Sequence, residues 1–257
     1  MLTPRFYIEF DKLELGEYLI KDDFILSHIK ALRMRINDNC SLFNGVSNYE
    51  WHANIKNIDK KSVTLKINNC YEIKRKLTKS INLIQSFINP TKLELIVEKV
   101  TELGIDNIYL TQTAYSNVNL TNENKEKKLH RLSKLIISAC EQCGRNVLPH
   151  LSYLEDWQNC LSFLKKLPHD TLKIFLSTDI ANSIKSNDII SIKNISDINI
   201  KNYEAIYYII GAEGGFSHKE QADLLEIGCI GVSLGNIILR AETASIAVLS
   251  YLNFTLL

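Results

Sequence analysis

One stretch near the C-terminus, residues 207–244, constrains the fold more than any other. It begins with an apolar run at 207–210 that glycine bounds, as is typical of a buried strand. A glycine-rich loop follows at 211–216, and then Ser217 and Glu220 have the spacing of a capping box at a helix start. The pattern repeats with a strand at 229–234, a loop at 235–239 and a final helix from residue 240 that is almost wholly apolar.

Two glycine-containing loops that each follow a strand should lie at one edge of a parallel sheet. That edge is where open α/β sheets bind ligands. Glycines there let backbone groups approach a ligand without a Cβ, although a single glycine more often only makes a tight turn. The pattern is neither GxGxxG nor GxxxxGK[ST], so the mechanisms of those motifs do not transfer. The residues alone predict a small-molecule site, with a nucleotide as one option.

Four segments together resemble a known enzyme family. The two loops read GAEGGF at 211–216 and LGNIILRAETA at 234–244. Upstream lie KLELIVEKVTELG at 92–104, with Lys92, Glu94, Lys99 and Glu102, and CEQCGRN at 140–146. In this order the segments resemble the SPOUT methyltransferases of the branch that methylates uracil N3 in small-subunit ribosomal RNA (the RsmE family). One segment alone would not be specific, whereas four in the family's order are.

The resemblance implies an α/β protein of two domains. Residues 1–75 would form a PUA-like β-barrel that binds RNA, and residues 76–257 a SPOUT methyltransferase domain with a C-terminal trefoil knot. The residues agree with this division. Apolar alternation near 6–10, 51–55 and 63–67, with an Asn44-Gly45 turn signal, predicts short strands. From residue 81 onward strands and helices alternate, as in a mainly parallel sheet flanked by helices.

Further elements are expected along the chain. Asp22 or Asp23 should cap a short helix with Phe24, Ile25, Ile29 and Leu32 on one side. Residues 70–80 are charged and without apolar rhythm, and we expect them to be a linker. Helices are predicted at 90–103, 122–143 and 156–167, strands at 81–88, 108–110 and 171–176, and a surface loop with little regular structure at 181–202.

By resemblance, S-adenosylmethionine would lie against the backbone of three loops, and no metal would be needed. Ile237, Ile238 and Leu239 would flank the adenine, although plain core packing is the alternative. The residues expected to bind the cofactor are Leu176, Ser177, Thr178, Ile210, Gly211, Ala212, Glu213, Gly214, Gly215, Leu234, Gly235, Asn236, Ile238 and Leu239.

The chemistry of N-methylation suggests the catalytic candidates. Uridine carries a proton on N3, so a general base or a cationic environment that favours the anion is needed. We name Arg240, Glu242, Glu213 and Arg145, with Glu141 and Lys92 as weaker candidates. Arg240 would stabilise the uracil oxyanion, and Glu213 would orient the substrate or, with a raised pKa, serve as the base. The alternative for Arg240 and Glu242 is a pair that only structures the start of the last helix.

RNA contact is expected from basic residues. Residues 1–80 hold 14 Lys and Arg against 10 Asp and Glu, while the rest of the chain is slightly acidic. The RNA-binding candidates are Arg5, Arg33, Lys92 and Arg145, and a solvated surface is the alternative for each. The expected partners are 16S ribosomal RNA or the small ribosomal subunit, and a second copy of the chain whose last helix helps to form a homodimer.

Three departures from the family pattern affect the site. Ala212 replaces the usual proline, which leaves the first loop less rigid. Ile237 stands where arginine is common, so one cationic contact is lost. Segment 111–116 lacks the arginine expected after its strand, and this puts an RNA contact there in doubt.

Composition excludes several classes of protein. No apolar run approaches the roughly 20 residues of a membrane span, and the N-terminus lacks a secretory signal, so we expect a cytoplasmic protein with no membrane contact. Its six cysteines should then be reduced. Cys140 and Cys143 form a single CxxC, and without a second pair a metal or redox role is not favoured.

Two alternative functions stay open at this stage. One is ribose 2′-O-methylation of RNA by an enzyme of the same fold, and the other is a non-catalytic RNA-binding assembly factor. A nicotinamide-dependent enzyme is a distant third, because the dinucleotide fingerprint is absent. The sequence identifies neither the target nucleotide nor the general base, and it does not say whether free RNA or the assembled subunit is the substrate.

Overall fold

Two compact units make up the chain. The computed structural model describes residues 3–10, 13–75, 79–116, 122–177 and 193–257. The first unit comprises Met1–Lys76 with Ile137–Leu148, and the second comprises Leu77–Ile136 with Pro149–Leu257. The second unit carries both glycine-containing loops and is therefore the unit in which the predicted site lies.

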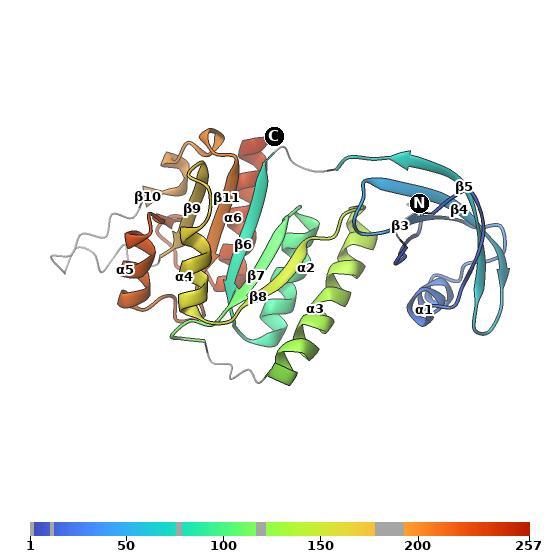
Figure 1. Cartoon of the computed structure of the whole chain (residues 1–257), viewed down its shortest axis with the longest axis horizontal. Helices are drawn as coiled ribbons and strands as arrows, with labels where there is room; N and C mark the ends of the chain where they lie inside the picture. Colours follow the sequence, from blue (N-terminus) through green and yellow to red (C-terminus); the bar gives the residue numbers. More distant parts are fainter. Residues whose placement is uncertain (1–2, 11–12, 76–78, 117–121, 178–192) are drawn as a thin grey trace. The chain divides into compact units, whose positions relative to one another are not determined.

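The first unit is built on a five-stranded sheet in the order β1-β3-β4-β5-β2 (Figure 1). Its strands are β1 (Arg5–Tyr7), β2 (Gly16–Ile20), β3 (Asn39–Phe43), β4 (Tyr49–Ile58) and β5 (Val63–Glu72). Strand β1 pairs in parallel with β3, and the other pairs are antiparallel. The predicted hairpin turn is confirmed, because Asn44 and Gly45 follow β3 and Gly45 has a positive φ of 77°.

The alternating apolar side chains of the strands form the core of this unit. The inward-facing side chains of β4 and β5 are almost completely buried, and they form one cluster with Ile25, Leu26 and Ile29 of α1 (Asp23–Ala31). Asp22 caps α1 by accepting hydrogen bonds from the N–H groups of the following turn, as predicted. Two of the four residues predicted for the apolar face of α1, Phe24 and Leu32, are instead exposed.

The predicted linker at 70–80 was wrong over much of its length. Residues 70–72 are the end of β5, where Cys70 lies opposite Trp51 and Glu72 opposite Tyr49. The next strand, β6 (Ser80–Ser86), already begins at residue 80. The charged side chains of this segment hid the strand, because they lie on an exposed surface where no apolar alternation is required.

A buried charge cluster fastens the segment 137–148 to the first sheet. Glu50 is 6% exposed and pairs with the guanidinium groups of Arg5 and Arg75, the latter at 3.1 Å. Arg5 also donates to the Arg145 carbonyl at 3.1 Å and to Asn146 Oδ1 at 2.7 Å. Burial raises the pKa of the Glu50 carboxyl, but the two arginines lower it more, so that its pKa lies below the usual 4.5.

The second unit contains a seven-stranded sheet in the order β10-β12-β9-β11-β6-β7-β8. After β6 its strands are β7 (Asn107–Thr111), β8 (His150–Leu154), β9 (Thr171–Leu176), β10 (Lys193–Asn194), β11 (Ala205–Ile210) and β12 (Ile230–Ser233). Every pair is parallel, as the alternation of strands and helices predicted. Strand β8 was missed, since its residues are only partly buried and show no period of two.

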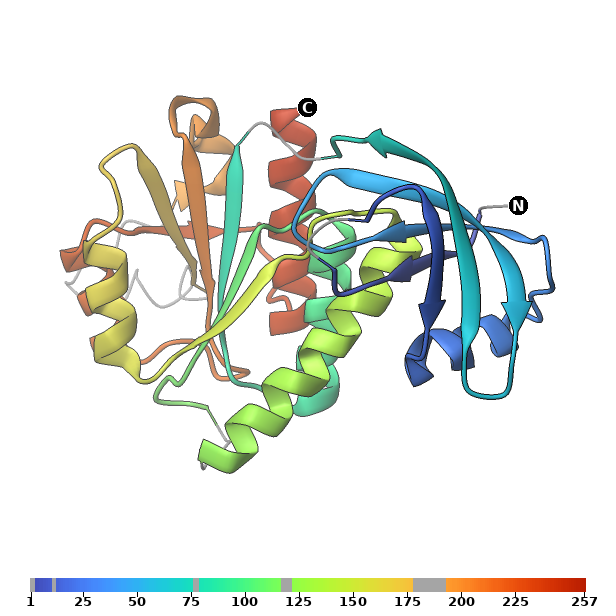
Figure 2. The same ribbon diagram turned by 45° about the vertical axis from the view of Figure 1, so that its right-hand side comes forward.

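Helices cover both faces of this sheet. They are α2 (Pro90–Glu102), α3 (Asn122–Cys143), α4 (Trp157–Lys165), α5 (His218–Glu226) and α6 (Ala241–Leu256), with 3₁₀ turns η2 (Ile195–Asp197) and η3 (Ile200–Asn202). Figure 2 shows the sheet between α4 on one side and α2 with α6 on the other. The first part of the loop expected at 181–202 lies outside the described residues, and the rest holds only β10 and the two short turns.

The strand order places three chain segments at one edge of the sheet. Strands β12, β9 and β11 are adjacent and parallel, so their carboxyl ends and the loops that follow them meet there. The capping box of α5 is present, with Ser217 and Glu220 bonded reciprocally. The trefoil knot that the resemblance implies stays a prediction.

Replacing Glu50 by glutamine should destabilise the protein at neutral pH. The change leaves the largely buried guanidinium of Arg5 and the more exposed guanidinium of Arg75 without their carboxylate, and breaking a buried pair such as Arg5–Glu50 costs about 3–5 kcal/mol. A depressed pKa stabilises the fold above the ordinary value of 4.5 and ceases to do so as the pH falls through the native value. The wild type and Glu50→Gln should therefore differ most in free energy of unfolding near pH 7 and converge in acid.

Urea denaturation at several pH values measures this difference. Glu72→Gln is the matched control, because Glu72 is exposed on the neighbouring strand and pairs only with exposed Lys74. Its effect should stay within about 0.5 kcal/mol. Equal effects of the two substitutions would show that the cluster contributes nothing beyond a surface pair.

Candidate active site

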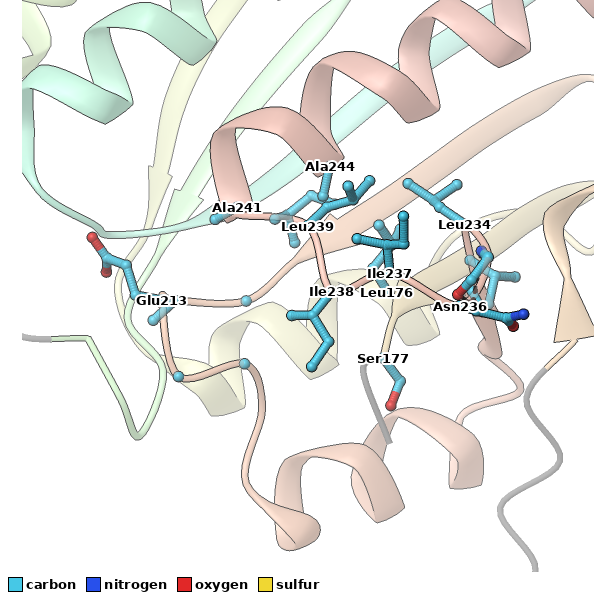
Figure 3. Close-up of a pocket in the computed structure, with 18 residues that line it drawn as sticks. Leu176, Ser177, Glu213, Leu234, Asn236, Ile237, Ile238, Leu239, Ala241 and Ala244 are labelled. Atoms are coloured by element: carbon cyan, nitrogen blue, oxygen red, sulfur yellow. Dashed lines mark hydrogen bonds between the residues drawn. The ribbon is translucent and has the colours of Figure 1, made fainter. Parts of the chain in front are cut away.

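The loops at the carboxyl edge of β9, β11 and β12 enclose a pocket of about 510 Å³ in the second unit (Figure 3). Its wall consists of backbone and apolar side chains over most of its surface. The residues that line it are Leu176, Ser177, Ile210–Gly215, Val232–Leu239, Ala241 and Ala244. Such a pocket suits a ligand that is held by main-chain N–H and C=O groups and by apolar contact.

The first glycine loop turns tightly between Gly211 and Gly215. The N–H of Gly215 donates to the Ala212 carbonyl at 2.9 Å, and Gly215 has a φ of 75°. A Cβ on Gly211 would lie 2.8 Å from the carbonyl carbon and oxygen of Gly215. Gly211 is therefore required by close backbone approach, and Gly215 by its left-handed conformation. Ala212 in place of proline is compatible with this turn.

Side chains of neighbouring elements hold the other two loops. Ser233 Oγ accepts from the Gly235 N–H at 3.1 Å and donates to the Gly235 carbonyl at 2.9 Å, which fixes the start of the second glycine loop. Ser177 Oγ donates to Gln221 Oε1 of α5 at 3.2 Å. Ile237 and Ile238 expose 79% and 77% of their surface on this pocket. They are thus an apolar surface available to a ligand and not part of the core.

The structure brings the predicted cofactor residues together. Thirteen of the fourteen line the pocket, and Thr178 lies outside the described residues. The prediction omitted Val232, Ser233, Ala241 and Ala244, which also line the pocket. A small or apolar side chain at a strand end or in a first helical turn carries no sequence signal for binding. These four residues are therefore recognised only from their positions in the folded protein.

Glu213 lies at one end of the pocket, far from Leu234 and Asn236 at the other (Figure 3). Its carboxylate pairs with Lys92 at 3.3 Å and accepts from the Asn89 N–H at 3.3 Å. Partial burial raises the pKa of the Glu213 carboxyl, but these donors and its own N–H lower it more, so the pKa is below the ordinary value. Service as the base would require a raised pKa, which Glu213 does not have in this structure, so its orienting role is the prediction that remains.

Arg240 and Glu242 occupy the start of α6. Arg240 is the exposed N-cap residue and, within the described part of the chain, pairs with no carboxylate. Glu242 is 9% exposed, and its Oε2 has no hydrogen-bond partner among the described residues. The alternative in which the two form an ion pair is therefore not observed. Lys92, Glu213, Arg240 and Ala241 line a second, smaller cavity of about 330 Å³.

Other predicted residues belong to the first unit. Arg5 is largely buried in the Glu50 cluster, and Arg145 accepts from it through its carbonyl. Glu141 accepts from the Tyr7 N–H at 3.0 Å, and its burial raises its pKa to about 7. Arg33 is exposed at the end of α1 with a φ of 54°. Their roles toward RNA stay predictions, and the contacts of Arg5 give that side chain a structural role.

Two further features concern metals and membranes. No three His, Cys, Asp or Glu side chains are grouped to hold a metal ion in the part of the chain that the structure describes. Cys140 is buried and Cys143 partly buried, and neither forms a disulfide with another cysteine of the described residues. None of the helices described here has the length and apolar character needed to cross a bilayer.

The fold and the pocket define a class of protein, the RNA methyltransferases. The family model of the RNA methyltransferase domain matches residues 75–253, and that of the RNA methyltransferase PUA domain matches residues 23–68. The presence of a PUA domain and a methyltransferase domain is thereby confirmed, whereas the bounds 1–75 and 76–257 stay predictions.

Individual relatives define the family more closely. Ribosomal RNA small subunit methyltransferase E of Buchnera aphidicola is 30% identical, with 97% of this chain and 92% of that protein covered. The protein of the same name from Rickettsia conorii is also 30% identical, with 97% and 95% covered. The chain belongs to the ribosomal RNA small subunit methyltransferase E family, as its four segments predicted.

Solved structures agree. The methyltransferase E of Neisseria gonorrhoeae, bound to S-adenosyl methionine, superposes with a TM-score of 0.83 at 27% identity over 99% of this chain and 98% of that one. A Legionella pneumophila protein in complex with the same cofactor gives 0.86 at 30% identity with the same coverage.

Replacing Gly211 by alanine should destabilise the second unit. The new Cβ meets backbone atoms that cannot move aside, and overpacking of this kind costs about 1–3 kcal/mol. Gly214→Ala in the same loop is the comparison variant, since its Cβ would lie 3.3 Å from Tyr115 and so needs a shift of only a few tenths of an ångström. Thermal unfolding should show a larger loss for the first variant, and equal losses would contradict the importance of this close approach.

Proposed function

We propose that this protein methylates N3 of a uridine in 16S ribosomal RNA with S-adenosylmethionine as the donor. The observation that carries the proposal is the pocket built from the loops after β9, β11 and β12, in a chain of the methyltransferase E family. Relatives in this family with known structures bind the cofactor, which supports the same ligand here.

The residues of the pocket fit this cofactor. The bare backbone at Gly211 and Gly215 leaves room for close approach, and the exposed Ile237 and Ile238 offer an apolar surface to the adenine ring. We assign to cofactor binding Leu176, Ser177, Thr178, Ile210–Gly215, Leu234–Asn236, Ile238 and Leu239. When bound, the cofactor supplies an electrophilic methyl group on a sulfonium, so the protein's task is positioning.

The chemistry then depends on the uracil. N3 must lose its proton before its lone pair attacks the methyl carbon, and the negative charge that develops is shared with the neighbouring carbonyl oxygens. Arg240 is exposed at the start of α6 and forms no ion pair with any residue that the structure describes, so its cation is available to stabilise that charge. Lys92 lies across the smaller cavity and is held by Glu213. Glu213 itself orients Lys92 and does not act as the base.

The first domain, residues 1–75, serves RNA binding in this proposal, and residues 76–257 carry out catalysis. Exposed Arg33 is the best placed of its predicted phosphate contacts. The enzyme acts in the cytoplasm as a homodimer. Support for the dimer comes from α6, where Phe254 exposes 79% of its surface in the single chain.

Methyl transfer from labelled S-adenosylmethionine to small ribosomal subunits that lack the modification tests the proposal. Nucleoside analysis of the digested RNA should give 3-methyluridine. A 2′-O-methylated nucleoside would instead indicate the alternative reaction. Absence of cofactor binding in calorimetry, by a folded protein, would identify an assembly factor without catalytic activity.

Replacing Arg240 by glutamine should lower kcat by about 10²–10³-fold, as the loss of one group that stabilises developing charge does. The cofactor's Kd should change little, because Arg240 does not line the larger pocket. Residual activity should rise with pH, since hydroxide removes the N3 proton when the cation no longer favours its loss.

Single-turnover kinetics and calorimetry measure these quantities. Lys219→Gln on exposed α5 is the charge-matched control and should behave as the wild type. An unchanged kcat in Arg240→Gln would remove Arg240 from the catalytic step.

A further inference from the structure

The segment after β7 carries an exposed aromatic side chain that the family pattern does not explain. The arginine expected in residues 111–116 is absent, and Tyr115 is the large side chain of this segment. We propose that Tyr115 is the surface on which the target uracil stacks. This inference rests on the proposed function and adds a substrate-contacting residue to it.

Tyr115 is presented by a tightly bonded turn. The N–H of Ser116 donates to the Thr113 carbonyl at 3.0 Å, and the Thr113 N–H donates to Ser116 Oγ at 3.1 Å. The hydroxyl groups of Thr113 and Ser116 also lie 3.1 Å apart. Three interactions across four residues hold the backbone of the turn, so the position of the Tyr115 Cα is set before any ligand binds.

A buried carboxylate ties this turn to the cofactor side of the sheet. Glu220 of α5 is 4% exposed and accepts from the Ala114 N–H at 2.8 Å. The same carboxylate accepts from the Ser217 N–H at 2.8 Å and from Ser217 Oγ at 2.9 Å. The loop after β7 and the first glycine loop, which runs directly into Ser217, are therefore held to one side chain.

Tyr115 packs against Gly214. A Cβ on Gly214 would lie 3.3 Å from Tyr115 Cβ, Cγ and Cδ2, so the near edge of the ring rests against bare backbone of the cofactor loop. Tyr115 nevertheless exposes 48% of its surface. Because Tyr115 packs against Gly214 and is otherwise exposed to solvent, its ring is available for stacking and is not part of the core.

The surroundings suit a uridine nucleotide. Glu213, the neighbour of Gly214 in the chain, lines the smaller cavity with Lys92 and Arg240. Tyr115 touches Gly214 and so is linked to this cavity through one chain neighbour. Proteins bind unstacked bases by combining aromatic surfaces with cationic side chains. Enzymes that modify a base take it out of the helix and stack it on aromatic or apolar side chains. Stacking on Tyr115 thus replaces the contact of the absent arginine.

Substitution of Tyr115 separates stacking from a structural role. Tyr115→Ala and Tyr115→Leu should lower kcat/KM for the RNA by about 10- to 100-fold, the usual effect of losing one stacked base. Tyr115→Phe, which keeps the ring, should restore most of the rate. Calorimetry should give a Kd for S-adenosylmethionine close to that of the wild type in all three, because Tyr115 does not line the larger pocket.

Photocrosslinking gives a readout that does not need activity. Small-subunit RNA transcribed with 5-iodouridine should crosslink to Tyr115 of the wild-type protein on irradiation, as identified by mass spectrometry of the digested adduct. If the wild type methylates uridine but Tyr115→Ala matches it and no adduct forms at Tyr115, the inference is wrong and the proposed function stands. If the wild type yields neither 3-methyluridine nor an adduct, both are wrong.

Discussion

Parallel pairing of β12, β9 and β11 is the interaction on which the rest of the site depends. Hydrogen bonds between these strands fix their carboxyl ends at one edge, so loops that are far apart in the sequence meet around a single pocket. Neither glycine loop could form the pocket alone. The close contact of Gly211 with Gly215 then shapes the first loop, because no side chain fits between their backbones.

Three charged side chains, Lys92, Glu213 and Arg240, line the smaller cavity. Glu213 neutralises part of the positive charge of Lys92, while Arg240 is left without a carboxylate partner in the described residues. A free cation at the start of α6 adds to the positive end of the helix dipole. The pKa of Glu213 lies below its ordinary value, which agrees with the proposal that Glu213 orients Lys92 and that cations stabilise the deprotonated uracil.

The two units use buried carboxylates in a similar way. Glu50 holds Arg5 and Arg75 in the first unit and so fixes the segment 144–146, while Glu220 holds the turn at Ala114 in the second. Each is a charged group that accepts several hydrogen bonds, and each connects segments distant in the sequence. Such groups cannot be recognised by periodicity, since a single acidic residue in a strand or first helical turn usually faces solvent.

The sequence by itself determined the parallel sheet and the place of a small-molecule site, because glycine loops, capping residues and apolar periods are local signals. The resemblance of four segments to a known family added the family and most of the residues that line the pocket. The sequence also placed α3 at its observed bounds. Only the tertiary structure decided the roles of charged residues. It put Arg5 into a buried cluster, lowered the pKa of Glu213 through Lys92 and Asn89, and seated Tyr115 on Gly214. The physical reason is that burial and charge pairing depend on neighbours brought together by folding, which no spacing along the chain records.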